Sequence, residues 1–357
     1  LTGDRPLRVE LLTNRTSEAE RRRITAALER GEVDVLIGTH ALIYEGVEFR
    51  RLGMVVVDEQ HRFGVEQRAL LRGKGDDPDV LVMTATPIPR TAAMLIYGDL
   101  ARSELRQLPP GRTPVTTRLV GPVLSERQAT YEHLLSEVAA GRQGYVVCPL
   151  VEGSERIEAK AATEEFERLS SGALSSVRVG LLHGQMKSRD KEAVMTAFRS
   201  REIDVLVATT VIEVGVDVSN ATVMIIEDAE RFGLSQLHQL RGRVGRGADA
   251  SICYLFADPG NPDAEERMAA MVDSTDGFLL AERDLEIRGS GAVFGERQSG
   301  ISDLKLGKIP RDEATVIATR EVVEEILDDD PNLDRHPRLA EEVADLLGDD
   351  VEFLFKS

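Results

Sequence analysis

Apolar residues gather in short continuous runs along this chain, and polar amphipathic segments separate the runs. Met54 to Val57 and Val223 to Ile226 are two of these runs, and they consist of Val, Ile and Met. Continuous runs of this kind are typical of parallel strands that are buried on both faces. The segments Ser17 to Arg30 and Ser188 to Arg199 are polar, with apolar positions at helical spacing. The alternation predicts an α/β fold built on parallel sheets.

The same succession of helix and strands occurs twice, at an offset of about 170 residues. Leu11 to Leu28 aligns with Leu181 to Phe198, and Glu32 to Ile37 aligns with Glu202 to Val207. A repeat of this length indicates two duplicated domains rather than a solenoid of short units. Ligands of such domains are expected beyond the carboxyl ends of the strands.

Proline and glycine mark the expected boundary between the two domains. We expect the first domain to cover residues 1–112 and the second to cover residues 113–257, with Pro109 to Pro114 at the join. Residues 258–300 open with a turn cluster and predict a helical hairpin followed by a glycine-rich loop. Residues 301–357 predict acidic C-terminal helices.

Composition narrows the classes of protein to consider. The 357 residues carry a formal net charge of -18, and the acidic residues concentrate in the last segment. This negative net charge argues against binding of nucleic acid by overall electrostatic attraction. Any contact with nucleic acid must therefore use local basic patches. Cys148 and Cys253 lie far apart inside apolar runs, which argues against a disulfide or a metal site. No apolar run is long enough to span a membrane, and we expect a cytoplasmic protein without a membrane partner.

Two arginines stand close together in the stretch from Gln239 to Gly247. Arg243 and Arg246 each lie beside a glycine, and no acidic residue lies between them. Arginine suits bidentate phosphate recognition, and an arginine supplied to a transferring phosphoryl group contributes about 10³ to 10⁵ in rate. The alternative is a solvated basic turn.

The first repeat carries acidic residues where its second strand ends. Asp58-Glu59-Gln60-His61 follows that strand, and Glu227-Asp228-Ala229-Glu230 stands at the aligned position of the second repeat. Adjacent carboxylates at a strand end can hold hydrated Mg²⁺ and accept a proton from water. The alternative is a solvated strand end. The two repeats therefore predict a phosphate-cleaving site that is divided between two domains and completed when they close.

Four motifs resemble, in order and spacing, those of superfamily-two helicases, namely Asp58 to His61, Thr84 to Pro87, Ala208 to Thr210 leading to Gly215 to Asp217, and Gln239 to Arg246. Further segments resemble the RecG family of bacterial branched-DNA helicases, namely Asp58 to Val65, Met83 to Arg90, Leu108 to Thr117, Val211 to Val218 and Leu285 to Gly300. The resemblance covers essentially the whole chain and implies two tandem RecA-like domains, the first truncated at its N-terminus. It also implies an ATP- and Mg²⁺-dependent DNA helicase or translocase, a monomer that remodels stalled replication forks and Holliday junctions in recombination and repair.

The resemblance assigns roles to single residues. Asp58 is expected to hold Mg²⁺ through water and Glu59 to polarise the attacking water. Gln60 and His61 are expected to belong to the same catalytic site and to couple it to Thr84 and Thr86. The remaining expected roles are nucleotide binding by Gly215, Asp217 and Gln239, and γ-phosphate contact by Arg243 and Arg246, the latter as the arginine finger.

DNA contacts are also implied by the resemblance. The expected contacts are Thr39 and His40 in the first domain, His183, Gly184, Thr209 and Thr210 in the second, and Arg267, Arg288 and Gln298 in the hairpin and loop, which resemble the RecG translocation motif. Hydroxyls and backbone amides can position phosphate without a high net charge. The alternative for the hairpin is a helical pair that only packs on the second domain.

One expected motif is missing from this sequence. No G-x-x-x-x-G-K-[ST] occurs, and the nearest string, Gly184 to Ser188, lacks the glycine before the lysine. We therefore expect a C-terminal motor fragment of a longer protein, without the wedge domain and without the strand that carries the phosphate-binding loop. Such a fragment is expected to be inactive alone, and the acidic tail is either a solvated helical face or an arm that docks on the absent wedge domain.

Other functions stay open at this stage. A transcription-repair coupling translocase has a similar motor and hairpin, although it usually has Glu where Gln60 stands. A non-catalytic DNA-binding module with a decayed motor is a second alternative, against which the retained acidic and arginine pairs argue. A protein-translocating ATPase is a third, and it would need a long insertion that this sequence lacks.

Overall fold

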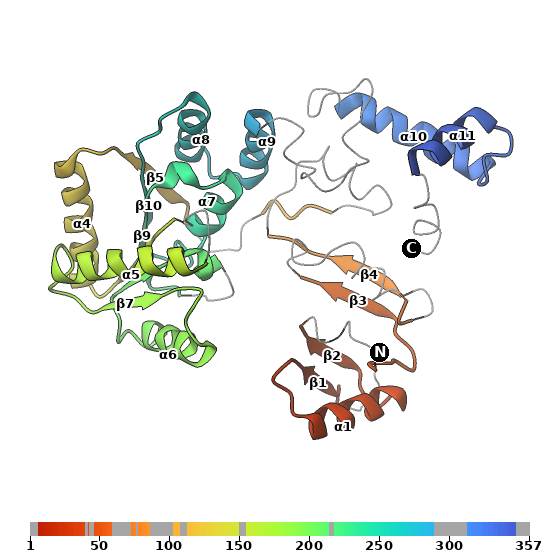
Figure 1. Cartoon of the computed structure of the whole chain (residues 1–357), viewed down its shortest axis with the longest axis horizontal. Helices are drawn as coiled ribbons and strands as arrows, with labels where there is room; N and C mark the ends of the chain where they lie inside the picture. Colours follow the sequence, from red (N-terminus) through yellow and green to blue (C-terminus); the bar gives the residue numbers. More distant parts are fainter. Residues whose placement is uncertain are drawn as a thin grey trace. The chain divides into compact units, whose positions relative to one another are not determined.

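The computed structural model describes residues 6–39, 42, 46–58, 73–75, 78–85, 103–107, 113–149, 155–213, 218–288 and 313–347. The chain divides into two compact units, residues 1–85 together with 329–357, and residues 86–328 (Figure 1). In the described part, no helix is long and apolar enough to cross a membrane. The predicted domain limits at residues 112, 257 and 300 stay predictions.

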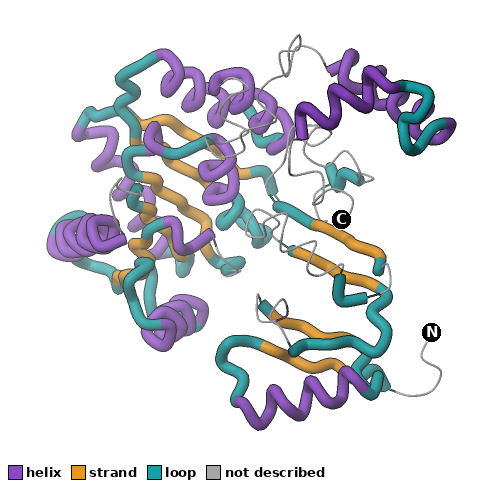
Figure 2. The backbone as a smooth tube through the Cα atoms, turned by 45° about the vertical axis from the view of Figure 1, so that its right-hand side comes forward, coloured by secondary structure: helices purple, strands orange, loops and turns teal. Residues whose placement is uncertain are grey.

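The larger unit is built on a six-stranded parallel sheet (Figures 1 and 2). Its strands are β5 (Val115–Val120), β6 (Gln143–Val147), β7 (Val179–Leu182), β8 (Val205–Ala208), β9 (Ala221–Ile226) and β10 (Ser251–Phe256), in the spatial order β5-β10-β9-β6-β8-β7. Every residue of β6, β8 and β9 is buried, as the continuous apolar runs predict.

Helices cover both faces of this sheet. The helices α4 (Leu124–Ala139) and α5 (Glu155–Ser171) pack on one face, where Leu134 and Leu169 are fully buried. The other face carries α6 (Ser188–Arg199), α7 (Leu234–Arg241), α8 (Pro262–Asp273) and α9 (Gly277–Arg288). The helices α8 and α9 form the predicted hairpin. Short 3-10 turns, η3 (Thr210–Glu213) and η4 (Ala229–Arg231), follow β8 and β9.

The smaller unit contains two separate pairs of parallel strands. The strand β1 (Val9–Leu12) pairs with β2 (Val35–Gly38) and carries α1 (Glu18–Glu29) on one face, whereas β3 (Met54–Val57) pairs with β4 (Asp79–Val82). The C-terminal segment adds α10 (Glu313–Asp329) and α11 (Pro337–Leu347) to the described elements.

The duplication predicted from the sequence is confirmed in the backbone. Val9 pairs with Val35 in the first repeat. The residues aligned with them, Val179 and Val205, pair with each other in the second repeat, so both strand pairs have the same register. Asp34 Oδ2 accepts a hydrogen bond from the Arg8 backbone N at 2.8 Å, and Asp204 does the same for Arg178 at 2.9 Å. The turn before the second strand is therefore built alike in both repeats.

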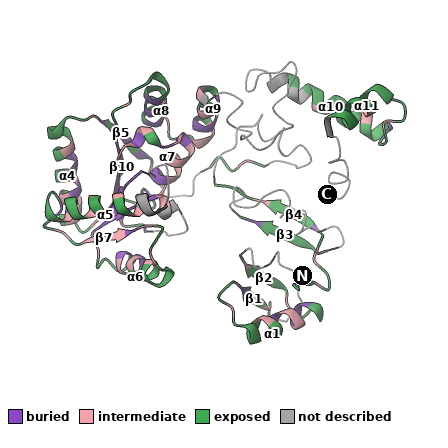
Figure 3. Cartoon of the chain, viewed as in Figure 1, coloured by how far each residue is buried: buried purple, intermediate pink, exposed green. Residues whose placement is uncertain are grey.

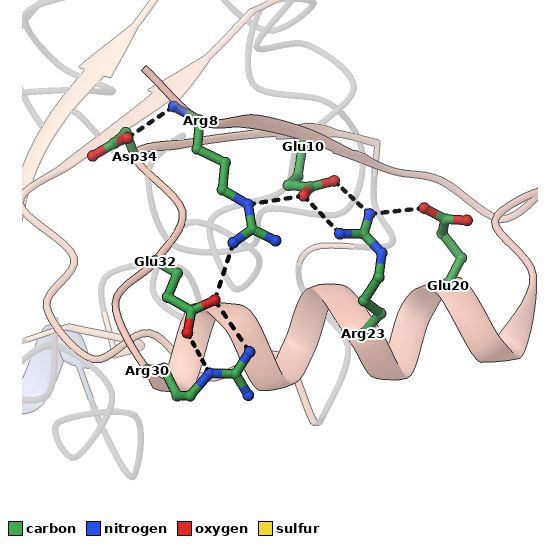
Figure 4. Close-up of polar contacts among 7 residues, drawn as sticks. All are labelled: Arg8, Glu10, Glu20, Arg23, Arg30, Glu32 and Asp34. Atoms are coloured by element: carbon green, nitrogen blue, oxygen red, sulfur yellow. Dashed lines mark hydrogen bonds and ion pairs between the residues drawn. The ribbon is translucent and has the colours of Figure 1, made fainter. Parts of the chain in front are cut away.

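Ion pairs connect the surface of α1 to the neighbouring chain. Figure 4 shows Arg23 donating to both carboxylate oxygens of Glu10, at 3.0 and 2.8 Å, and to Glu20 at 2.8 Å. Arg30 holds Glu32 in the same network, and its hydrogen bonds lower the pKa of Glu32 to about 2. The pairing of Arg23 with Glu10 connects α1 to β1.

One face of each strand pair in the smaller unit is exposed and apolar (Figure 3). On β1 and β2 this face carries Val9, Leu11, Val35 and Ile37, and on β3 and β4 it carries Met54, Val56 and Leu81, all between 42 and 60% exposed. The aligned residues of the larger unit face α4 and α5 and are mostly buried. The two repeats thus share strands but not the cover on this face.

Candidate functional site

The carboxyl ends of β3 and β4 bring two of the predicted site residues to one edge. Val57 pairs with Val82, and the Met83 backbone N donates to Val57 O at 2.8 Å. Asp58 and Thr84 therefore follow neighbouring parallel strands, and both are exposed. The predicted coupling between the acidic motif and Thr84 stays a prediction. Glu59, Gln60, His61 and Thr86 lie outside the described residues.

The aligned edge of the larger unit is arranged differently. Glu227 follows β9 with 12% of its side chain exposed, and its Oε1 accepts a hydrogen bond from Tyr131 Oη at 2.7 Å. Arg127 and Arg168 approach its carboxylate at 3.7 and 3.9 Å. Burial raises the pKa of Glu227, and the hydrogen bond from Tyr131 opposes that rise in part. This carboxylate is engaged inside its own unit, whereas Asp58 is presented at the surface.

The arginine-bearing loop follows α7, whose apolar side anchors it. Leu237 and Leu240 are fully buried in the core, and so is Val244, which lies between the two arginines. Gly245 has a φ of 72°, and a Cβ there would meet Val115 Cγ2 at 2.5 Å. The loop is therefore pressed against the start of β5 in a conformation that requires glycine.

This packing places the two predicted arginines on either side of a buried anchor. Arg246 is exposed, and its Nε donates to Gly242 O at 3.0 Å, whereas Arg243 is half-buried. Gln239 is half-buried on α7. A fixed loop with guanidinium groups is suited to contact an anion such as a phosphate. Gly215 and Asp217 lie outside the described residues.

The residues predicted to line a DNA path follow β2, β7 and β8. Thr39 is exposed after β2, and its aligned residue Thr209 is only 2% exposed after β8. Thr210 and His183 are half-buried, and burial together with Lys191 lowers the pKa of His183. The described members thus lie at carboxyl ends of strands, but Thr209 does not reach the surface. His40 lies outside the described residues, and all these DNA contacts stay predictions.

The predicted DNA-binding residues of the hairpin have one fully described member. Arg267 on α8 is half-buried and donates from Nη2 to Glu230 O at 2.9 Å, so its side chain lies against η4. Arg288 ends α9, and its side chain lies outside the described part, as does Gln298. The structure therefore gives Arg267 a role in attaching α8 to the turn after β9, which the sequence did not indicate.

The sequence analysis also missed Arg241, which precedes the arginine-bearing loop. It is 3% exposed, and its guanidinium contacts the end of α8. The available signal was its place at the end of an amphipathic helix between buried Leu237 and Leu240 on one side and Val244 on the other. An arginine inside an apolar helical face indicates a specific internal partner.

The exposed carboxylate of Asp58 fits a ligand of hydrated Mg²⁺ at the edge of β3. Exposed carboxylate oxygen is the ligand that hydrated Mg²⁺ takes in proteins, often with several waters retained. Among the described residues, no group of three or more His, Cys, Asp or Glu side chains is placed to enclose a metal ion. Metal binding by Asp58 stays a prediction.

Three family models match this sequence. The DEAD/DEAH box helicase model matches residues 3–95, and the helicase conserved C-terminal domain model matches residues 126–248. The C-terminal part of domain 3 of the ATP-dependent DNA helicase RecG matches residues 274–342. The matched ranges follow one another along the chain and leave short intervals between them.

Curated relatives match over most of the chain. An ATP-dependent DNA helicase RecG of Synechocystis sp. is 51% identical over 349 residues, which is 97% of this chain and 42% of that protein. The ATP-dependent DNA helicase RecG of Bacillus subtilis is 47% identical over 304 residues, 85% of this chain and 44% of that protein. The chain spans less than half the length of these relatives.

Solved structures agree with the fold class. A structure of RecG bound to a three-way DNA junction is 43% identical, with a TM-score of 0.67, and the match covers 87% of this chain and 40% of that one. Saccharomyces cerevisiae Dbp5 L327V, bound to RNA and ADP BeF3, matches 78% of this chain and 76% of its own at 13% identity and a TM-score of 0.52, which shows the fold alone. The predicted tandem RecA-like α/β fold is confirmed.

Proposed function

Because this chain belongs to the RecG family, we propose that its two RecA-like units form the motor of an ATP-dependent helicase that acts on branched DNA. The whole protein would couple ATP hydrolysis to translocation on duplex DNA and so remodel stalled forks and Holliday junctions. We place it in the cytoplasm, at the nucleoid, as a monomer whose wedge domain lies outside residues 1–357.

The proposal rests on the different surroundings of two aligned carboxylates. Asp58 is exposed where β3 ends, whereas Glu227 is engaged by Tyr131 where β9 ends. The loop with Arg243 and Arg246 belongs to the unit whose own carboxylate is engaged. Duplicated units with an exposed carboxylate at a strand end of one and guanidinium groups on the other support a site to which both contribute.

The proposed roles follow from the chemistry of these side chains. When bound, Mg²⁺ would neutralise charge on the β- and γ-phosphates of ATP. Asp58 would bind the hydrated ion, and the next residue, Glu59, would accept a proton from the attacking water. Arg246 would stabilise charge on the transferring phosphoryl group. A site divided in this way would tie hydrolysis to closure of the units.

The smaller unit would be completed by a segment outside residues 1–357. In the larger unit, β6 lies between β8 and β9, and α4 and α5 cover the face that is apolar and exposed on β1 to β4. We propose a β-α-β-α segment equivalent to residues 115–171 as the missing cover. It would also supply the phosphate-binding loop, since no G-x-x-x-x-G-K-[ST] occurs in this sequence.

The test is DNA-stimulated ATP hydrolysis by the whole protein with matched substitutions at the aligned positions. Asp58→Asn should lower kcat by about 10² or more, because it removes the metal-binding charge. Glu227→Gln is the control, and it should leave kcat within about threefold of the wild type, since Gln can still accept the hydrogen bond from Tyr131.

The same assay would expose an error in the assignment. Equal loss of activity in both variants, or hydrolysis that survives Asp58→Asn, would contradict a site built on the β3 edge. Hydrolysis that depends on Asp58 but responds equally to linear and forked duplexes would support a motor and contradict the proposed preference for branched DNA.

A further inference from the structure

The arginine-bearing loop, from Arg243 to Arg246, leads to Asp249, which precedes β10 and is held through both its backbone and its side chain. Thr113 Oγ1 and Ser251 Oγ donate to the backbone O of Asp249 at 3.2 and 3.3 Å. Arg142 Nη2 donates to Asp249 Oδ1 at 3.1 Å. The last of these contacts joins the end of the loop to a distant part of the chain, the turn between α4 and β6.

The guanidinium of Arg142 is oriented before it reaches Asp249. Gly141 has a φ of 84° in the turn after α4, and the Arg142 backbone N donates to Glu137 O at 3.0 Å. Arg142 Nη1 donates to both carboxylate oxygens of Glu137, at 3.0 and 3.1 Å. Thr222 Oγ1 donates to the same carboxylate at 2.8 Å and so fixes it on β9. Because Glu137 holds Nη1 of a planar group, Nη2 is directed at Asp249.

A second contact reaches the end of the same loop from the segment before β9. A Cβ on Gly247 would lie 2.5 Å from Ser219 O, so the two backbones are in close contact there. The next residue, Asn220, donates from Nδ2 to Gly141 O at 3.1 Å. The turn that carries Arg142 is therefore joined to the segment that contacts the end of the loop.

These contacts suit a restraint on position better than a contribution to folding stability. Asp249 has 52% and Arg142 has 32% of its side chain exposed, and exposed ion pairs contribute little to stability. A catalytic group that is displaced by about 1 Å, in contrast, can lose about 10² in rate. Arg246 lies between buried Val244 on one side and Asp249 on the other. The position of its guanidinium therefore depends on both attachments of the loop.

We propose that Arg142 is a positioning residue for the predicted γ-phosphate contact of Arg246, and that it acts by holding Asp249 at the end of the loop. Without the Arg142 guanidinium, Asp249 stays attached by its backbone only, and the Arg246 guanidinium takes a wider range of positions. This inference rests on the proposed motor function, and it adds a residue from the turn between α4 and β6 to the site.

The test is ATP hydrolysis by the whole protein, stimulated by a forked DNA duplex. Arg142→Gln should lower kcat about fivefold and change KM for ATP by less than about twofold, because the arginine contact strengthens as charge develops in the transition state. Asp249→Asn is an exposed, nearly isosteric change and should have the same effect. The control is Arg178→Gln, which removes an exposed ion pair with Asp204 before β7 and should leave kcat unchanged.

Double variants separate positioning from a general effect on the fold. Arg246→Gln removes the group that is to be positioned, so adding Arg142→Gln should lower its single-turnover rate by less than about 1.5-fold. Arg142→Gln combined with Asp249→Asn should lower kcat no further than either change alone. If Arg142→Gln lowers the rate about fivefold with and without Arg246, or if Asp249→Asn has no effect, the proposal is overturned.

Hydrogen exchange provides a readout that does not depend on hydrolysis. The backbone amides of residues 245–249 should exchange at least about threefold faster in Arg142→Gln and Asp249→Asn than in the wild type, and at the wild-type rate in Arg178→Gln. Unchanged exchange in the first two variants would show that Arg142 does not hold the loop. A wild-type protein without ATP hydrolysis would contradict the proposed function, whereas exchange would still decide whether this attachment exists.

Discussion

Glu227 shows that a side chain can have different surroundings from the residue aligned with it in the other repeat. It stands where Asp58 stands in the first repeat, yet it is largely buried and accepts a hydrogen bond from Tyr131. Arg127 and Arg168 approach it, but Glu165 lies near enough to oppose ionisation. Desolvation is the largest effect and raises its pKa. The aligned acid is thereby turned from a possible ligand into an internal polar contact.

This raised pKa gives a pH dependence with a definite sign. Between the ordinary pKa of about 4.5 and the raised pKa of the folded state, the folded protein binds more protons than the unfolded one. The contribution of Glu227 to stability is therefore present at low pH and is lost as the pH rises through the folded pKa. Glu227→Gln should remove this loss, so its free energy of unfolding relative to wild type should improve from pH 4 to pH 7.

Urea unfolding at about pH 4 and pH 7 measures the effect. Tyr131→Phe provides the comparison, because it removes the hydrogen bond that favours the charged form of Glu227. In this variant, which keeps Glu227, the loss of stability between the two pH values should be larger than in the wild type. A stability difference between wild type and Glu227→Gln that is the same at both pH values would show that Glu227 titrates normally.

Helix ends show what the two repeats share at the scale of elements. The helices α1 and α6 both end before a residue in the left-handed region, Gly31 with a φ of 71° and Arg201 with a φ of 62°. Their backbone N atoms donate to Leu28 O at 2.9 Å and to Phe198 O at 3.2 Å. The same turn is thus made with glycine in one repeat and with a residue that resists this conformation in the other.

Replacing the arginine by glycine should stabilise the end of α6. Arg201→Gly should raise the free energy of unfolding by about 1 kcal/mol, because a left-handed conformation costs an L-residue about that much. The Arg201 carbonyl that accepts from Arg178 at 2.7 Å is kept. Gly31→Ala is the reciprocal change and should destabilise by about 1 kcal/mol. Chemical denaturation measures the free energy of unfolding of both variants. If Arg201→Gly leaves it unchanged, other contributions to stability offset the backbone strain.

At the scale of the whole molecule, the two units differ in how far their sheets are covered. Ile37 on β2 is 54% exposed, whereas the aligned Val207 on β8 is 0% exposed, and both point to the same face of their strand pairs. Exposed apolar strands of this extent mark a surface that another segment covers. The comparison identifies α4, β6 and α5 as the elements that provide this cover in the larger unit.

Substitution at these aligned positions should have opposite outcomes. In residues 1–357, Ile37→Asn should change the free energy of unfolding by less than about 0.5 kcal/mol, since the side chain already meets solvent. Val207→Asn should cost about 3 kcal/mol or more, because it buries an unsatisfied amide. In the whole protein, Ile37→Asn should become comparably costly. A severe effect of Ile37→Asn in residues 1–357 would show that this face is already covered.

The sequence by itself determined the class of fold and the location of the motifs. Continuous apolar runs predicted the buried parallel strands, and the repeat at about 170 residues predicted equivalent strand pairs, because burial on both faces leaves little freedom in residue type. These features depend on local pattern and order along the chain. The pairing that puts Asp58 and Thr84 after neighbouring strands came from the structure.

Only the tertiary structure decided which charged groups face outward and which are used internally. Glu227 and Asp58 occupy aligned positions in the sequence, but Tyr131 reaches Glu227 from α4, 96 residues earlier in the chain. Arg241 stands beside the arginine motif in the sequence, but its guanidinium donates to carbonyls at the end of α8. Such contacts join segments far apart in sequence, and neither periodicity nor spacing records them.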